Sequence, residues 1–296
     1  MDPGARLTLR DGRTLAYDDV GDPAGRPVVY LHGTPDSRLA RHPDDAVAAA
    51  CGVRLLAVDR PGAGASVPHP TGTLESLGAD LLELADHLAL ERLALLGWSA
   101  GGLFALAAAS VLGPRAAAVS LVGTVPPVEA YQDPTVVDAL SPSRQHFVEL
   151  AAELPPEELG LELAPYLVPD PVTAAVALDH VLESAGPQGR AELASTPGAA
   201  ERLAVALVDA VAQGRDGLAH DVALQLQPGL DLAAVTCPVR TTHGTEDGMS
   251  PPAVGEWLAA RLPQATVEMV PGGGHHLLFP RWSTLLQDLA AGIPGP

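Results

Sequence analysis

Short apolar runs alternate with longer helical patterns through the first part of the chain. Pro27–Leu31, Arg54–Val58 and Arg92–Leu96 are nearly continuous apolar runs, which is typical of strands buried on both faces of a parallel sheet. Between two of them, the leucines of residues 74–88 recur at helical spacing. Strands that alternate with helices predict βαβ units and a mostly parallel sheet.

The N-terminus has a different pattern. Residues 6–10 alternate apolar and polar side chains, Asp11-Gly12 is a turn signal, and residues 13–19 can return as a second strand. We therefore expect a hairpin before the parallel strands. Residues 39–50 and 101–112 are predicted to be helices.

The alternation stops at Gly123. Residues 126–221 contain no convincing strand and are predicted to form short helices separated by prolines at 155, 156, 165, 169, 171 and 187. Strand patterns return at 239–243 and 265–270, with a closing helix at 282–289. The pattern predicts one α/β core, formed by residues 1–125 and 222–296, that is interrupted by a helical insertion at 126–221.

Composition narrows the class of protein. The chain is 47% hydrophobic, but no apolar run reaches the roughly 18 residues of a membrane helix. Residues 1–11 are polar and do not resemble a signal peptide. Two distant cysteines, Cys51 and Cys237, indicate no disulfide framework. We therefore expect a soluble cytoplasmic protein that has no membrane span.

The charge of the chain excludes one class of partner. The formal net charge is −19, and arginine supplies every Lys or Arg side chain. So negative a surface repels phosphate backbones, which argues against nucleic-acid binding. The expected partner is a small-molecule substrate, and the oligomeric state stays open.

Gly97-Trp98-Ser99-Ala100-Gly101 matches the pattern G-x-S-x-G and lies between a predicted strand and a predicted helix. Glycines are needed there because the serine occupies a tight turn whose flanks come close to neighbouring backbone. The turn places the serine hydroxyl beside a helix N-terminus, where backbone N–H groups favour a negative oxygen. Ser99 is therefore the candidate nucleophile.

A nucleophilic serine needs a base, and the base needs a carboxylate that orients it. In this type of site the acid and then the histidine follow the serine along the chain. Asp247 lies just past a predicted strand, with Glu246 as its rival, and His275 follows a glycine-rich stretch at 272–274. Only one of the adjacent pair His275 and His276 can be the base, because neighbouring side chains on an extended loop point in different directions. We choose His275, since it directly follows glycines whose missing side chains let the loop approach the nucleophile turn.

Two backbone N–H groups are expected to form an oxyanion hole. The group after the nucleophile is that of Ala100, and the second comes from the loop after the strand at 27–31, where Thr34 is placed to supply it. His32 is expected to brace this loop. Trp98 and Phe147 are expected to line the substrate pocket.

Five motifs stand in order along the chain: His32-Gly-Thr-Pro35, Asp59-Arg-Pro-Gly-Ala-Gly-Ala-Ser66, Gly97-Trp-Ser-Ala-Gly101, Gly244-Thr-Glu-Asp247 with Pro251, and Gly274-His275. In these motifs the chain resembles the α/β-hydrolase superfamily, in its cap-bearing esterase and lactonase-like branch. The resemblance covers residues 6–125 and 222–292. It implies an eight-stranded, mostly parallel sheet flanked by helices, with a helical cap inserted after the sixth strand.

The resemblance also implies an activity. Asp247 matches the family's acid and His275 its histidine, while residues 59–66 match a structural turn and not a phosphate loop. A serine at position 99 argues against the aspartate-nucleophile dehalogenases and epoxide hydrolases, and Thr34 in place of a second glycine argues against prolyl aminopeptidases.

We therefore expect hydrolysis of a carboxylic ester or lactone of small to medium, mainly apolar character, through an acyl-enzyme and without a metal or cofactor. The same groups could instead serve C–C bond hydrolysis, acyl transfer or a lyase reaction. A third hypothesis is a ligand receptor without catalytic activity.

Overall fold

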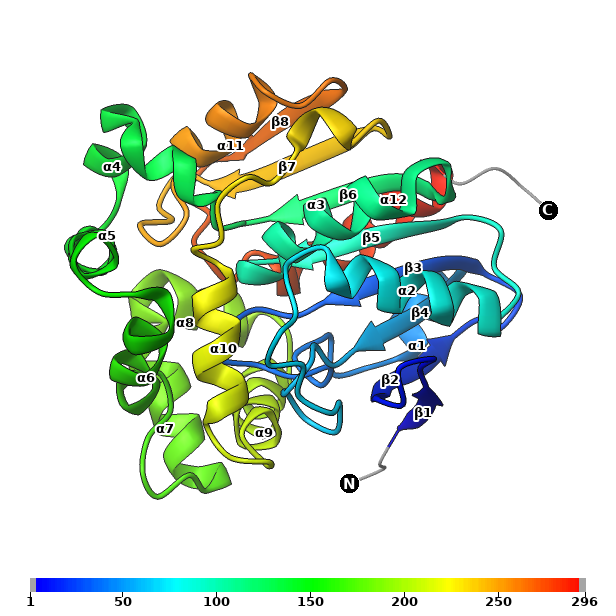
Figure 1. The fold of residues 1–296 in the computed structure, drawn as a ribbon, viewed down its shortest axis with the longest axis horizontal. Coiled ribbons are helices and arrows are strands. Elements are labelled where there is room, and N and C mark those ends of the chain that lie inside the picture. The colour runs from blue at the N-terminus through cyan, green and yellow to red at the C-terminus, as the bar shows by residue number, and fades with distance from the viewer. Residues whose placement is uncertain (1–3, 293–296) are drawn as a thin grey trace.

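In the computed structural model, residues 4–292 are described, and within them eight strands form one sheet with helices on both faces (Figure 1). The strands are β1 (Ala5–Thr8), β2 (Thr14–Gly21), β3 (Arg26–Leu31), β4 (Val53–Val58), β5 (Leu93–Trp98), β6 (Ala116–Val122), β7 (Val239–Gly244) and β8 (Ala265–Val270). Their order across the sheet is β1-β2-β4-β3-β5-β6-β7-β8. This is the fold class predicted from the sequence.

The helices divide between the core and the insertion. The core carries α1 (Ala46–Ala50), α2 (Ser76–His87), α3 (Ala100–Leu112), α11 (Pro252–Ala259) and α12 (Leu278–Gly292). The insertion carries α4 (Pro134–Ala139), α5 (Pro142–Glu153), α6 (Pro156–Leu167), α7 (Ala174–Ser184), α8 (Gly186–Ala194), α9 (Ala199–Ala210) and α10 (Asp216–Leu224). Short 3-10 turns occur at Gly113–Arg115, Val128–Gln132 and Leu232–Ala234.

The sheet has an antiparallel edge and a parallel centre. β1 pairs antiparallel with β2, and β2 pairs antiparallel with β4, so the predicted hairpin forms one edge. The strands from β4 across to β8 are parallel. The carboxyl ends of these parallel strands therefore share one edge of the sheet, where loops from distant parts of the chain meet.

Two apolar layers enclose the central strands. One layer packs α2, α3 and α11 against the sheet, and the other packs α1 and α12 against the opposite face. Every residue of β5 is buried, which explains why its sequence is apolar without alternation. The rigid centre of the sheet thus ends directly at Ser99.

The helices α4–α10 lie between β6 and β7 in the chain and gather at the end of the sheet where the parallel strands finish (Figure 1). Their apolar side chains, among them Phe147 and Leu207, belong to the same buried layer as α12 and Trp98. Pro165 was expected to separate two helices, but α6 continues through it. Its position near the end of α6 leaves few downstream hydrogen bonds to lose, and the carbonyl it blocks belongs to the exposed Leu161.

The prediction of a helix at residues 39–50 was wrong for the first part of that range. The structure forms α1 only from Ala46 to Ala50. Pro43 disfavours helical backbone at the residue before it. Upstream, the buried Arg38 and Arg41 share the carboxylate of Asp18 at 2.9 and 2.7 Å, and these ion pairs hold the segment in an irregular path.

Within residues 4–292, no helix combines the length and the apolar character needed to cross a bilayer.

Candidate active site

Ser99 occupies a strained turn between β5 and α3. Its backbone has φ 53° and ψ −125°, a conformation that non-glycine residues rarely adopt. The flanking glycines are required by close packing, since a Cβ on Gly101 would lie 2.1 Å from the carbonyl oxygen of Leu31 and a Cβ on Gly97 would lie 2.5 Å from that of Gly101. The turn therefore holds the Ser99 side chain clear of the sheet, as the sequence motif predicts.

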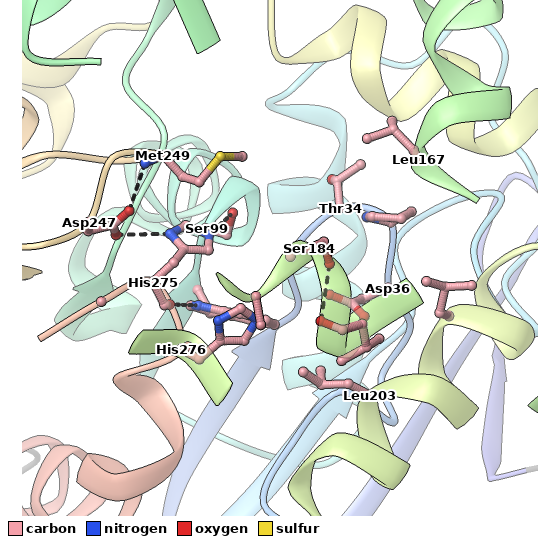
Figure 2. Close-up of a pocket in the computed structure, with 18 of the residues that line it drawn as sticks. Thr34, Asp36, Ser99, Leu167, Ser184, Leu203, Asp247, Met249, His275 and His276 are labelled. Atoms are coloured by element: carbon pink, nitrogen blue, oxygen red, sulfur yellow. Dashed lines mark hydrogen bonds and ion pairs between the residues drawn. The ribbon is translucent and has the colours of Figure 1, made fainter. Parts of the chain in front are cut away.

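His275 and Asp247 reach Ser99 from the loops that follow β8 and β7. The Nε2 atom of His275 lies 3.0 Å from the Ser99 hydroxyl, and its Nδ1 lies 2.9 Å from Oδ2 of Asp247 (Figure 2). The other Asp247 oxygen accepts the backbone N–H groups of Met249 and Ser250, each at 2.9 Å. The carboxylate is thus buried, oriented and fully hydrogen-bonded.

The charges of this pair support each other. Burial raises the pKa of Asp247, but the charge and hydrogen bond of His275 and the hydrogen bond from Ser250 outweigh that effect. The resulting pKa lies below the ordinary value. Burial lowers the pKa of His275, while the charge and hydrogen bond of Asp247 raise it above the ordinary value. An imidazolium formed at His275 is therefore stabilised, which is what a proton-accepting group requires.

Neither of the rivals considered from the sequence takes part in this series. Burial and the neighbouring His275 lower the pKa of His276 to about 3, and the centroid of its ring lies 5.8 Å from that of Trp98 with the two planes tilted by 57°. Glu246 is exposed, and among the described contacts it is Asp247, and not Glu246, that bonds to His275. The structure brings together Ser99, His275 and Asp247.

Thr34, Ser99 and Ala100 together line a small cavity of about 80 Å³. Ala100 is the first residue of α3, so its N–H has no carbonyl partner within the helix. Among the described residues, neither this N–H group nor that of Thr34 donates a backbone hydrogen bond.

The loop that carries Thr34 is held from the core and from the insertion. The Thr34 hydroxyl donates to Asp221 of α10, which also forms a 2.6 Å ion pair with Arg60. The Arg60 guanidinium donates to the carbonyls of His32 and Gly33. His32 is fully buried, its Nδ1–H donates to the carbonyl oxygen of Gly33, and burial holds its pKa well below the ordinary value. It braces the loop as expected.

Ser99 also lines a larger cavity of about 350 Å³. Its wall includes Trp98 from the core and apolar side chains from the insertion, namely Val181, Leu203 and Leu207. Phe147 lines the small cavity instead, together with Arg144. The two side chains expected to line a pocket therefore face different cavities.

Two groups that position the histidine loop were not found from the sequence. The buried Glu192 of α8 accepts the backbone N–H of Gly274 at 2.5 Å and that of His276 at 2.9 Å. The indole N–H of Trp98 donates to the carbonyl of His275 at 2.9 Å. No local pattern marks Glu192, because its partners lie more than eighty residues away in the chain.

Comparisons with known proteins identify the family and the fold. The family model described as the alpha/beta hydrolase fold matches residues 26–281. A proline iminopeptidase of Xanthomonas citri is 36% identical over 123 residues, and the match covers 39% of this chain and 37% of that protein. A non-heme chloroperoxidase of Streptomyces lividans is 34% identical over 43% of this chain and 47% of that protein. The chain thus aligns with less than half the length of these relatives.

Solved structures extend the likeness over almost the whole chain. Esterase RhEst1 from Rhodococcus sp. ECU1013 has a TM-score of 0.69 at 19% identity and covers 98% of both chains. The enol-lactonase from Burkholderia xenovorans LB400 has a TM-score of 0.65 at 20% identity and covers 97% of this chain and 99% of that one. At these identities the likeness shows the fold alone. With the family model matched over most of its length, the chain belongs to the α/β-hydrolase family.

Proposed function

We propose that this protein is a serine hydrolase that cleaves a carboxylic ester or lactone through an acyl-enzyme. The single observation that carries the proposal is the unbroken hydrogen-bonded series from Asp247 through His275 to the Ser99 hydroxyl. Serine is a weak nucleophile at neutral pH, and a neutral imidazole 3.0 Å away is close enough to accept its proton as it attacks.

The reaction runs in two halves. Oγ of Ser99 bonds to the substrate carbonyl carbon while its proton passes to Nε2 of His275. The carbonyl oxygen, now negative, accepts hydrogen bonds from the N–H groups of Thr34 and Ala100. The intermediate collapses as the C–O bond to the leaving alcohol breaks, and His275 gives the proton to that alcohol. Water then attacks the acyl-enzyme by the same route and releases the acid.

The cavities bound the substrate. A volume of about 350 Å³ suits a small to medium molecule, and the apolar side chains of its wall favour a mainly apolar one. We infer that the helices of residues 126–221 act as a cap that selects the substrate, because they supply Val181, Leu203 and Leu207 to this wall while the reacting groups come from the core.

An amide is the second candidate substrate. The sequence similarity to proline iminopeptidases favours it, and the same series of groups can cleave an amide when the leaving nitrogen is protonated. Thr34 stands where those enzymes usually carry a second glycine, and for this reason we rank esters and lactones first.

A panel of short p-nitrophenyl esters, lactones and aminoacyl amides tests the proposal. The wild type should hydrolyse esters or lactones, and Ser99→Ala should lose on the order of 10⁶ in rate. Ser110→Ala is the matched control, since its hydroxyl bonds only within α3 and its activity should equal that of the wild type. Cleavage of amides without esters would move the assignment to a peptidase, and ester activity that survives in Ser99→Ala would refute it.

A further inference from the structure

Asp36 places a carboxylate inside the larger cavity, beside the nucleophile. It lies in the loop after β3 and lines the same cavity wall as Ser99. A Cβ on Gly33 would lie 3.2 Å from Oδ2 of Asp36 and 3.3 Å from Cβ of Ser99, so the carboxylate and the nucleophile flank the same glycine. Figure 2 shows Asp36 between Ser184 and Leu203, across the cavity from Asp247.

This carboxylate has no structural partner. Among residues 4–292, no hydrogen bond or ion pair to the Asp36 side chain is present, in contrast to Asp59 and Asp247, which are buried and fully bonded. Arg60, whose charge lowers the pKa of Asp36, already pairs with Asp221 and donates to the carbonyls of His32 and Gly33. The side chain is partly exposed and lines the cavity, so its carboxylate is open to a bound molecule and is not used by the fold, which favours a role in binding.

The charges around Asp36 act on its pKa in opposite directions. Burial raises the pKa of Asp36, Asp221 adds to that effect, and Arg60 and His275 oppose it, so that the resulting pKa is about 7. The same cavity is lined by the carboxylates of Asp247 and Glu246, by the imidazoles of His180, His275 and His276 and, among its described lining residues, by no arginine. The field inside the cavity therefore favours a positive group, in a protein whose net charge is −19.

We propose that Asp36 binds a positively charged nitrogen of the substrate, so that the preferred substrates are esters or lactones that carry an amino or ammonium group. The proposal rests on the proposed ester chemistry for turnover, but binding of the cation stands by itself. The carbonyl lies at Ser99, the nitrogen contacts Asp36, and the apolar remainder packs on Leu203 and Leu207. The bound cation favours the ionised carboxylate, so any proton on Asp36 leaves as the substrate binds.

Two esters of matched shape test this assignment. Butyrylcholine carries a permanent positive charge, and 3,3-dimethylbutyl butyrate replaces its quaternary nitrogen by carbon. We expect the wild type to favour the choline ester at least tenfold in kcat/KM, mainly through KM. Asp36→Asn should reduce that preference about tenfold, equivalent to about 1.4 kcal/mol. Asp138→Asn removes the same charge from the exposed side of α4 and should keep the wild-type preference.

The pH dependence gives a second readout. Because the choline charge does not titrate, its KM should fall as Asp36 ionises through a pKa of about 7, and KM for the neutral ester should not follow. This dependence should vanish in Asp36→Asn. A wild type without preference for the choline ester, or an Asp36→Asn variant that keeps it, would overturn the proposal.

Calorimetric binding to Ser99→Ala separates the two proposals. If the choline ester binds more tightly than its neutral isostere, and loses that advantage in Ser99→Ala/Asp36→Asn, the role of Asp36 stands even where neither ester is hydrolysed. Lack of hydrolysis would then contradict only the proposed ester chemistry, and not the binding role of Asp36. Equal binding of both esters to Ser99→Ala overturns the role of Asp36, whatever the enzyme hydrolyses.

Discussion

The imidazole of His275 is subject to opposing influences that together set its protonation. Burial lowers its pKa, Asp247 raises it, and the guanidinium of Arg144, across the small cavity, lowers it. The net pKa lies above the ordinary value of about 6.5. Because the base must be neutral to accept the Ser99 proton, kcat/KM should rise with pH through a pKa higher than that of a free histidine.

Arg144→Gln tests this balance. Removal of the positive charge removes an influence that lowers the pKa of His275, so the acid limb of the pH–kcat/KM profile should move to higher pH. Arg190→Gln removes an equal charge from an exposed site on α8 and should leave the limb in place. The electrostatic account would be wrong if the limb of Arg144→Gln stayed fixed or moved to lower pH.

A pair of single variants tests the choice between the two adjacent histidines. His275→Ala should lose on the order of 10⁶ in kcat, close to Ser99→Ala, because base and nucleophile act as one unit. His276→Ala should keep kcat within about tenfold and change mainly KM, since its ring lines the cavity and does not reach Ser99. Steady-state assays on one ester compare them. The reverse pattern would make His276 the base.

At the scale of elements, the decisive contact is the crossing of α3 over the end of β3. Gly101 lies against the carbonyl oxygens of Leu31 and His32, which an added Cβ would approach to 2.1 and 2.4 Å. Both oxygens belong to backbone and cannot move aside without displacing the strand. The close approach between the turn at Ser99 and the loop that carries Thr34 therefore depends on the missing side chain of Gly101.

Gly101→Ala should thus destabilise the protein by about 3 kcal/mol or more. The measurement is urea unfolding followed by circular dichroism. Gly292→Ala is the matched control, because its Cβ would meet Ala118 at an ordinary 3.4 Å, and its free energy of unfolding should change by less than about 0.5 kcal/mol. A Gly101→Ala protein as stable as this control would contradict the packing described.

Local patterns in the sequence were enough to predict the central strands and the loops that follow them. β5 and its serine turn were found because a continuous apolar run ends in glycines. Glu192 and Asp36 were not found, because their roles depend on contacts or on a cavity that form only after folding. The helix predicted at residues 39–50 began too early for the same reason, since the ion pairs of Arg38 and Arg41 with Asp18 join residues that are distant in the sequence.

At the scale of the whole molecule, the insertion is bonded to the core around the site. Asp221 of α10 pairs with Arg60, and Glu192 of α8 holds the loop of His275. Asp209 of α9 lies 3.2 Å from Arg38. The insertion therefore contributes to the wall of the cavity and also to the placement of the reacting groups. A change in the insertion can thus affect both substrate selection and the chemical step.

The overall charge adds a prediction about ionic strength. With a net charge of −19, the protein repels anions over distances that salt shortens. For an ester with several negative charges, kcat/KM should rise as salt is raised from about 0.05 to 0.5 M, while a neutral ester should change less than about twofold. A steep fall with salt for the anionic ester would reveal a cationic binding surface that this account does not include.

The most direct test of the central claim is the site of covalent labelling. A fluorophosphonate reacts with a serine that is activated by a base and leaves a stable adduct on its oxygen. Mass spectrometry of the digested protein should find this adduct on Ser99, with none in Ser99→Ala and little in His275→Ala. An adduct on a different residue, or ester hydrolysis by a protein that the probe does not label, would contradict the assignment of Ser99 as the nucleophile.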